Sequence, residues 1–332
     1  MRLHPSLLAP VFWAAAFAAC TTFPRAEPAV SDLTVRERAE VDAAIALYRL
    51  SRPSEAAPAL RKYLDREDPL AKMYYAAMLA DGLGVDKDQD RAAALARAGA
   101  PALRVMADRG VVNAQLIYGR LLESGLGVDK DFGEALRWYR KAAARGSAAA
   151  QYSIGRLYEE GTVVAQDMKT ALRWYEKAAA GGDAGAQNNL GVLYWEGNGV
   201  VQDSTEAFKW FRRAAEKGLP EAFSNLGVMY ASGDGVAEDD KEAERWHREA
   251  ARHQMSDAHF NLGLFLLRDP ADPQKLTEAY SWFLIALGEG DEGARSELEN
   301  LEKVLTPRQI MRATGAADAW FAALDSHRRG SR

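Results

Sequence analysis

Apolar side chains recur along most of the chain with the period of an amphipathic helix. Residues 114–122 place four apolar side chains at i, i+4, i+7 and i+8, on one face of a helix, and residues 135–143 repeat this stripe. Gly125 and Gly127 separate the two stripes, and Gly146 follows the second. Because glycine ends helices and forms turns, this order predicts a unit of helix, turn, helix, turn. The pattern indicates an all-α fold.

This helical unit repeats with a fixed period of 36 residues. Three combs of one residue type keep the period in register, and chance does not produce three of them together. They are Trp138, Trp174, Trp210, Trp246 and Trp282; Gly119, Gly155, Gly191, Gly227 and Gly263; and Ala114, Ala150, Ala186, Ala222 and Ala258. An earlier copy begins at Ala71, where residues 81–88 match residues 124–131 at a separation of 43, seven more than the period. Seven residues are two helical turns, so we expect them near residues 99–101, lengthening or breaking the second helix.

The period divides the chain into segments. Residues 1–19 are predicted as a signal peptide, 20–31 as an extended tether, 32–70 as an N-terminal helical cap, 294–326 as a C-terminal helical cap and 327–332 as a frayed tail. Residues 71–293 form six repeats, with expected boundaries at 71–113, 114–149, 150–185, 186–221, 222–257 and 258–293.

The repeated strings resemble a known family. Residues 189–200, NLGVLYWEGNGV, and 171–179, ALRWYEKAA, are similar to the Sel-1-like repeat, a relative of the tetratricopeptide repeat. The resemblance implies a right-handed α-solenoid of helix-turn-helix repeats with helical caps. Val163 departs from the pattern at the second turn glycine, and residues 269–273 replace the glycine turn of the last copy. Some Sel-1-like proteins are linked to penicillin binding or hydrolysis, but they resemble a cysteine-rich form, and this chain has one cysteine.

The N-terminus has the pattern of an export signal. Arg2 precedes an apolar run from Leu7 to Ala19, which is shorter than the ~20 residues that span a bilayer. The run ends in Phe17-Ala-Ala-Cys20, which resembles the lipobox of bacterial lipoproteins and implies lipidation of Cys20. Ordinary secretion with cleavage after Ala18 and a buried N-terminal helix are the alternatives. In lipoproteins, Asp after the cysteine favours the inner membrane, so Thr21 suggests an outer-membrane lipoprotein that faces the periplasm.

Charge and composition exclude several functions. The net charge is −5, which argues against a nucleic-acid binder, and the single Cys20 excludes an internal disulfide and a cysteine zinc site. No carboxylate pair or phosphate loop stands out, so we expect no catalytic residues, cofactor, metal site or small-molecule substrate. His247, His253 and His259 are spaced by six, which is not the spacing of one helix face. We interpret them as surface imidazoles, with a metal site as the weaker alternative.

Other repeated positions favour structural roles. The Trp and Tyr combs of the second helices could stack on carbohydrate, but their place on the inner stripe favours the core. Asp131, Asp167, Asp203 and Asp239 precede the second helices, where a carboxylate accepts hydrogen bonds from free backbone N–H groups.

These expectations combine into a functional hypothesis. A solenoid offers a long concave surface, so we expect a non-catalytic scaffold that binds a protein partner in this groove and is anchored in the cell envelope through Cys20. Alternatives are an accessory factor for envelope polysaccharide export or cell-wall synthesis, and a hydrolase. By similarity to tetratricopeptide repeats, the groove residues are expected to be Arg120, Arg156, Asn188, Asn189, Asn225, Phe260 and Asn261. Trp195, four residues beyond Gly191, is expected to add an aromatic anchor. The competing interpretation is that the asparagine amides only bridge adjacent helices.

Overall fold

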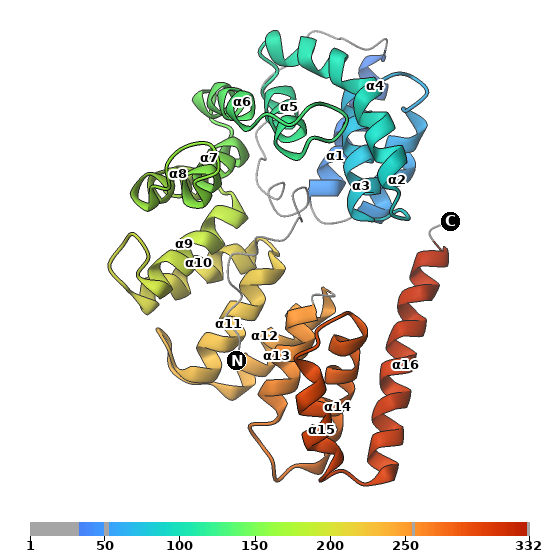
Figure 1. Cartoon of the computed structure of the whole chain (residues 1–332), viewed down its shortest axis with the longest axis vertical. Helices are drawn as coiled ribbons and strands as arrows, with labels where there is room; N and C mark the ends of the chain where they lie inside the picture. Colours follow the sequence, from blue (N-terminus) through green and yellow to red (C-terminus); the bar gives the residue numbers. More distant parts are fainter. Residues whose placement is uncertain (1–32, 50–52, 254–255, 331–332) are drawn as a thin grey trace.

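The computed structural model describes residues 33–49, 53–253 and 256–330, and within these ranges the chain forms sixteen helices and no strand. The helices stack in pairs around an open arc (Figure 1). In chain order they are α1 (Val35–Arg49), α2 (Pro53–Lys62), α3 (Pro69–Asp81), α4 (Gln89–Asp108), α5 (Val112–Ser124), α6 (Phe132–Ala144), α7 (Ala148–Glu160), α8 (Met168–Ala180), α9 (Ala184–Glu196), α10 (Ser204–Glu216), α11 (Pro220–Ser232), α12 (Asp240–Arg252), α13 (Ser256–Leu266), α14 (Pro273–Gly288), α15 (Ala294–Glu302) and α16 (Pro307–Gly330). The predicted all-α solenoid of helical repeats is confirmed.

Aspartates cap the start of the second helix in each central repeat, and glycines end the first helix. The predicted aspartate caps are present: Asp131 Oδ1 accepts a hydrogen bond from the Glu134 amide at 2.8 Å, and Asp203 Oδ1 accepts one from Glu206 at 2.9 Å. Asp167 and Asp239 cap α8 and α12 in the same way. The first helix of each central repeat ends in a left-handed glycine, such as Gly125 with φ of 75°. This conformation is strained for residues with a side chain, which is why glycine recurs there.

A ring comb and a glycine comb hold the two helices of each repeat together. The glycine of the first helix faces a ring of the second that is wholly inaccessible to solvent; the rings belong to Tyr139, Tyr175, Phe211, His247 and Phe283. These rings follow the Trp comb by one residue. Trp138 is buried, but the other four tryptophans of the comb are half-buried. The deepest position is therefore not the tryptophan that marks the repeat but its neighbour.

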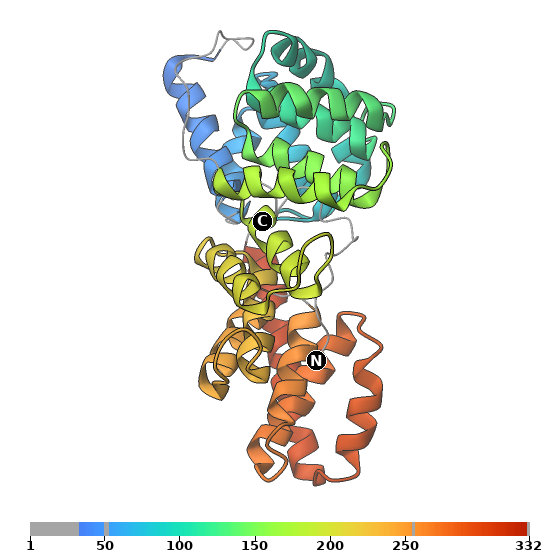
Figure 2. The ribbon, with the colours of Figure 1, turned by 90° about the vertical axis from the view of Figure 1, so that its left-hand side faces the viewer.

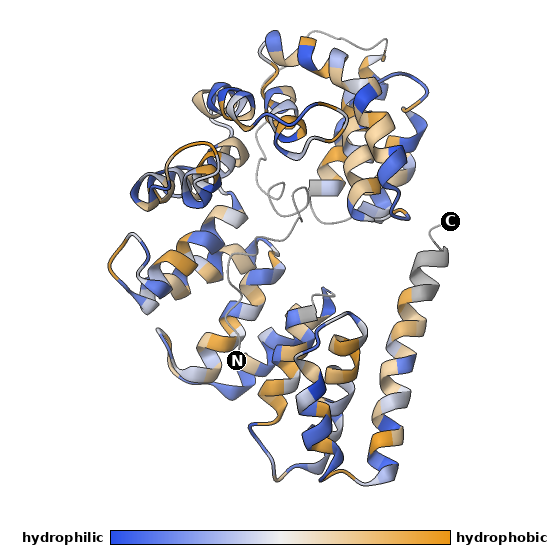
Figure 3. Cartoon of the chain, viewed as in Figure 1, coloured by the Kyte–Doolittle hydropathy of each residue, from blue (hydrophilic) through white to orange (hydrophobic). Residues whose placement is uncertain are grey.

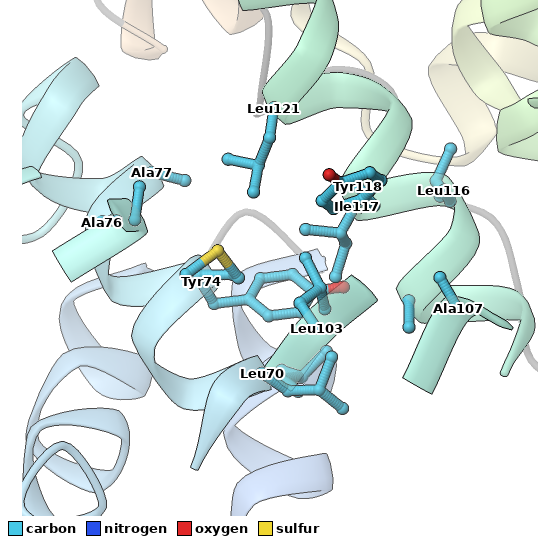
Figure 4. Close-up of a cluster of buried hydrophobic side chains, with 14 of the residues drawn as sticks. Leu70, Tyr74, Ala76, Ala77, Leu103, Ala107, Leu116, Ile117, Tyr118 and Leu121 are labelled. Atoms are coloured by element: carbon cyan, nitrogen blue, oxygen red, sulfur yellow. The ribbon is translucent and has the colours of Figure 1, made fainter. Parts of the chain in front are cut away.

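The first repeat absorbs its extra residues within a helix. Helix α4 has 20 residues whereas α6, α8, α10 and α12 have 13 each, and it runs unbroken through Pro101. Its inner face joins α3 and α5 in a cluster that includes Tyr74, Leu103 and Ile117 (Figure 4). The seven additional residues thus lengthen the second helix and leave the stack continuous.

The C-terminal end is closed by α15 and α16. Helix α16 lies along α14: Gln309 Nε2 donates to Pro273 O at 3.3 Å near the start of α14, and Phe321 packs against Gly288 at its end. It then runs along the open side of the arc, with mixed apolar and polar residues along its length (Figures 1 and 3). It continues to Gly330, so part of the expected frayed tail is helical.

The N-terminal expectations fall outside the part of the chain that the structure describes. The signal segment, Cys20 and the tether all precede residue 33. Within the described ranges, no helix combines the length and the apolar character needed to cross a bilayer.

Candidate protein-interaction surface

The predicted groove residues all lie on the first helices of consecutive repeats. Helices α5 and α7 lie on the inner side of the arc and their partners α6 and α8 on the outer side (Figure 1). The residues are Arg120 on α5; Arg156 on α7; Asn188, Asn189 and Trp195 on α9; Asn225 on α11; and Phe260 and Asn261 on α13. The fold therefore arranges them in a series along the stack, one helix after another.

Most of these side chains are packed rather than open to solvent. Six of the eight are buried, namely Arg120, Asn188, Asn189, Asn225, Phe260 and Asn261. Arg156 keeps 21% of its side chain exposed, and Trp195 is half-buried. Their role in binding a partner stays a prediction, and Arg156 and Trp195 are the two members with substantial exposed surface.

Two of the asparagines form a bridge between neighbouring repeats. Asn225 Nδ2 on α11 donates a hydrogen bond to Asn188 Oδ1 on α9 at 3.0 Å, and both side chains are buried. A buried amide needs such a partner, because leaving it unsatisfied costs about 1–3 kcal/mol. For this pair the structure contains the contact that the competing interpretation expected.

A buried network of tyrosine, glutamate and arginine spans α5 to α8. Tyr139 Oη donates to Glu123 Oε2 at 2.5 Å, and Tyr175 Oη donates to Glu159 Oε2 at 2.5 Å, one repeat further on. Burial raises the pKa of both tyrosines and of Glu159. Arg156 pairs with Glu123 from the preceding repeat and with Glu160 at 3.3 Å. The helical period does not reveal this network, although glutamate and tyrosine keep a separation of 16 residues in both copies.

The next repeat replaces this network with aromatic contacts. Trp195 stands where the earlier copies have Glu123 and Glu159, and its indole Nε1 donates to Asp234 Oδ2 at 2.5 Å. Its ring meets Phe211 edge-to-face, with centroids 5.6 Å apart. The arginine position also becomes apolar from here on, as Val192, Val228 and Leu264. At the positions equivalent to Arg120 and Glu123, the first helices thus change from charged to apolar side chains after α7.

The histidines differ from the sequence expectation. His247 and His259 are fully buried, so the interpretation as three surface imidazoles is wrong for both, and only His253 is exposed. His247 occupies the ring position that is Tyr or Phe in four other copies. Neither of its nitrogens has a hydrogen-bond partner, and burial lowers its pKa to about 4. The six-residue spacing of the histidines does not show this, but the 36-residue period does, because His247 falls in the ring comb one residue after the tryptophans.

His259 sits at the last repeat junction. Its Nε2 lies 2.9 Å from Ala251 O and its Nδ1 lies 2.7 Å from Glu289 Oε2. The ring stacks on Trp282 and meets Trp320 of α16 edge-to-face. Within residues 33–49, 53–253 and 256–330, no three His, Cys, Asp or Glu side chains are grouped to hold a metal ion.

Comparisons with known proteins place this architecture among repeat proteins. The Sel1 repeat family model matches residues 69–100, 112–147, 148–183, 184–219, 220–254 and 256–291. The crystal structure of c5321, a protective antigen of uropathogenic Escherichia coli with an SLR fold, is 30% identical with a TM-score of 0.66, over 88% of this chain and 60% of that one. The chain thus spans less than two thirds of that relative. A Sel1 repeat protein from Oxalobacter formigenes is 31% identical with a TM-score of 0.50, over 68% of this chain and 88% of that one. None of the curated proteins matches.

Proposed function

Because the chain belongs to the Sel1 repeat family, whose members are generally protein-interaction scaffolds, we propose that it is a non-catalytic scaffold that binds a protein partner along its first helices. The observation that carries this proposal is the change in character along those helices. Arg156, with its glutamate partners, lies on α7 in the third repeat, and the positions equivalent to Arg156 are apolar from Val192 on α9 onward. Such a series favours an extended partner whose charged and apolar parts meet successive repeats.

Trp195 is the proposed anchor for this partner. Its ring is half-buried and held by two contacts, the hydrogen bond to Asp234 and the edge-to-face contact with Phe211. A side chain already fixed in place loses little conformational freedom on binding, and tryptophan is enriched among the residues that dominate interface energies.

The proposal includes the cell envelope as location. The lipobox-like segment that ends at Cys20 supports a lipid anchor, with the repeats facing the periplasm at the outer membrane. We propose no catalytic role. Turnover of a lactam, ester or cell-wall substrate by the purified chain, abolished by a substitution in the repeats, would contradict this part.

Photo-crosslinking in intact cells tests the partner site. A photoreactive phenylalanine analogue replaces Trp195 on an inner helix or, in a control chain, Arg137 on the outer face of α6. We expect the analogue at 195 to give one dominant protein adduct, identified by mass spectrometry, that the analogue at 137 does not give. Equal adducts from both positions, or no protein adduct at 195 in a chain that folds normally, would refute the groove assignment.

A further inference from the structure

The outer face of the central repeats carries two parallel rows of cations. Three consecutive second helices, α6, α8 and α10, each present an exposed basic residue at one position and another four residues later, one turn along the same face. The first row is Arg137, Arg173 and Lys209, and the second row is Lys141, Lys177 and Arg213. We call this set the cation grid. Helices α6 and α8 form the outer edge of the arc in Figure 1 and face the viewer in Figure 2.

Most of the cation grid has no carboxylate partner within the described chain. Among its members only Lys209 forms an ion pair, with Glu206 at 2.8 Å. On the second helix of the next repeat, α12, arginines do have carboxylate partners: Arg245 pairs with Glu242 at 3.0 Å and Arg252 with Glu249 at 2.6 Å. The grid is therefore a local excess of positive charge on a chain whose net charge is −5.

The second row is held in place by the tryptophan comb. Lys141 Nζ lies 3.8 Å from the centre of the Trp138 ring, Lys177 Nζ lies 4.7 Å from that of Trp174, and the Arg213 guanidinium lies 4.5 Å from that of Trp210. A cation over an aromatic face is attracted to the ring, which limits the freedom of the long side chain. The row is thus ordered before any ligand arrives.

We propose that the cation grid binds an anionic lipid surface, with the outer face of α6, α8 and α10 against the headgroups. A single nucleic-acid strand is bound in a groove with free aromatic faces for base stacking, whereas this face is the outside of an arc and its tryptophans are covered by cations. A broad outward face fits an extended charged plane.

This inference does not depend on lipidation of Cys20 or on the identity of the protein partner. Each basic residue close to an anionic surface contributes about 1 kcal/mol, or about a fivefold increase in the partition coefficient. The attraction falls with added salt, because the Debye length shortens from about 10 Å at 0.1 M to about 3 Å at 1 M.

Vesicle flotation tests the proposal. The full chain carrying Cys20→Ser is mixed with vesicles of phosphatidylglycerol and phosphatidylethanolamine or of phosphatidylcholine alone, and the ratio of the two partition coefficients is measured. The ratio removes any binding that does not depend on anionic lipid. We expect a clear preference for the anionic vesicles that is lost in 1 M salt. Replacement of Arg137, Lys141, Arg173 and Lys177 by Gln is expected to lower the ratio by more than about tenfold.

Two further variants keep the result interpretable. Arg137→Gln with Arg173→Gln leaves the tryptophan contacts intact and still lowers the ratio severalfold, even if the fourfold variant folds poorly. The matched control is Arg245→Gln with Arg252→Gln on α12, which removes two cations already neutralised by glutamates and leaves the ratio nearly unchanged. Equal binding to both vesicle types, equal losses in grid and control variants, or retention of single-stranded DNA without preference for anionic vesicles would overturn the proposal.

Discussion

Gly227 of α11 lies directly against the imidazole of His247 of α12: a Cβ at Gly227 would come within 2.7 Å of Nδ1. The same contact forms in every central repeat, where the glycine and the ring that it faces are 20 residues apart in the sequence. A Cβ would lie 2.5 Å from the Tyr139 ring at Gly119 and 2.6 Å from the Phe211 ring at Gly191. The glycines therefore leave room for a ring at the centre of each helix pair, since real Cβ atoms essentially never lie within 3.0 Å of a neighbouring atom.

Gly191→Ala is expected to destabilise the fourth repeat. The added methyl group overlaps the Phe211 ring, and overpacking of this kind costs about 1–3 kcal/mol. Chemical denaturation followed by circular dichroism measures the change. Gly315→Ala on α16 is the control, because nothing lies within 4 Å of its Cβ position, so it should gain up to about 1 kcal/mol of helix propensity. Equal effects at the two positions would contradict the packing argument.

His247 is expected to make the fold sensitive to acid. Burial lowers its pKa to about 4, below its ordinary value of 6.5, so the folded state disfavours protonation. The stability that depends on neutral His247 is complete above pH 6.5 and is lost as pH falls through 4, with a total of about 3 kcal/mol. His247→Phe is expected to raise the melting temperature and to flatten its dependence on pH between 6.5 and 4.

The reciprocal substitution is the control for this effect. Phe211→His places an imidazole at the equivalent buried position of the preceding repeat, against Gly191. It should lower the melting temperature most at acidic pH and create the pH dependence that His247→Phe removes. A pH profile that neither substitution alters would assign the acid sensitivity to other groups.

Asp183 is expected to have the opposite effect to His247, because it lowers the stability of the fold as pH rises. Its Oδ1 caps α9 at 2.9 Å from the Ala186 amide, its Oδ2 has no hydrogen-bond partner, and burial raises its pKa to about 7. A folded-state pKa above the ordinary 3.8 means that the stability from this group is complete below pH 3.8 and is lost as pH rises through 7. Ser147 caps α7 at the equivalent position, so Asp183→Ser should keep the cap and stabilise the chain at neutral pH, with little change near pH 4. Thermal melts across this range measure it; a loss at neutral pH would contradict the argument.

Substitutions at the Asn188–Asn225 bridge distinguish a structural role of these amides from a role in binding a partner. Each single alanine substitution leaves the other buried amide without its partner, so we expect each to cost about 1–3 kcal/mol and the double substitution to cost less than the sum. Denaturation of the two single variants and the double variant forms the cycle. If stability is unchanged while partner capture falls, the amides serve the ligand and not the helix junction.

Cys20→Ser tests the envelope anchor. Several acyl chains bury many CH₂ groups at about 0.8 kcal/mol each, so a lipidated chain stays in the membrane fraction. We expect the substitution to abolish incorporation of labelled fatty acid and to make the chain releasable from the membrane fraction by 1 M salt, which screens the remaining contact of the cation grid with anionic lipid. Unlabelled original protein in the membrane fraction would show that another feature holds it there.

The repeats can be predicted from the sequence because small residues and aspartate helix caps recur with a fixed period. Ala114 and its equivalents are wholly buried, and the aspartate caps form the predicted hydrogen bonds. The inner surface is harder to predict, since its key contacts join residues from different repeats. The Asn225–Asn188 bond spans 37 positions and the Trp195–Asp234 bond spans 39. A helical period identifies which face of one helix is apolar, but it does not identify which neighbour satisfies a buried polar group.

Variation between copies of the buried pairs has a consequence for how the chain finds its register. Nearly identical repeats invite a loop-out, in which one unit is skipped and α9 docks where α7 belongs, at little entropic cost. Such a slip would place Val192 where Arg156 belongs and remove the arginine that pairs with the buried Glu123 of α5. The loss of this partner for a buried carboxylate would penalise the wrong pairing. Differences between the repeats, and not only their likeness, therefore favour the correct order of the helices over a slipped one.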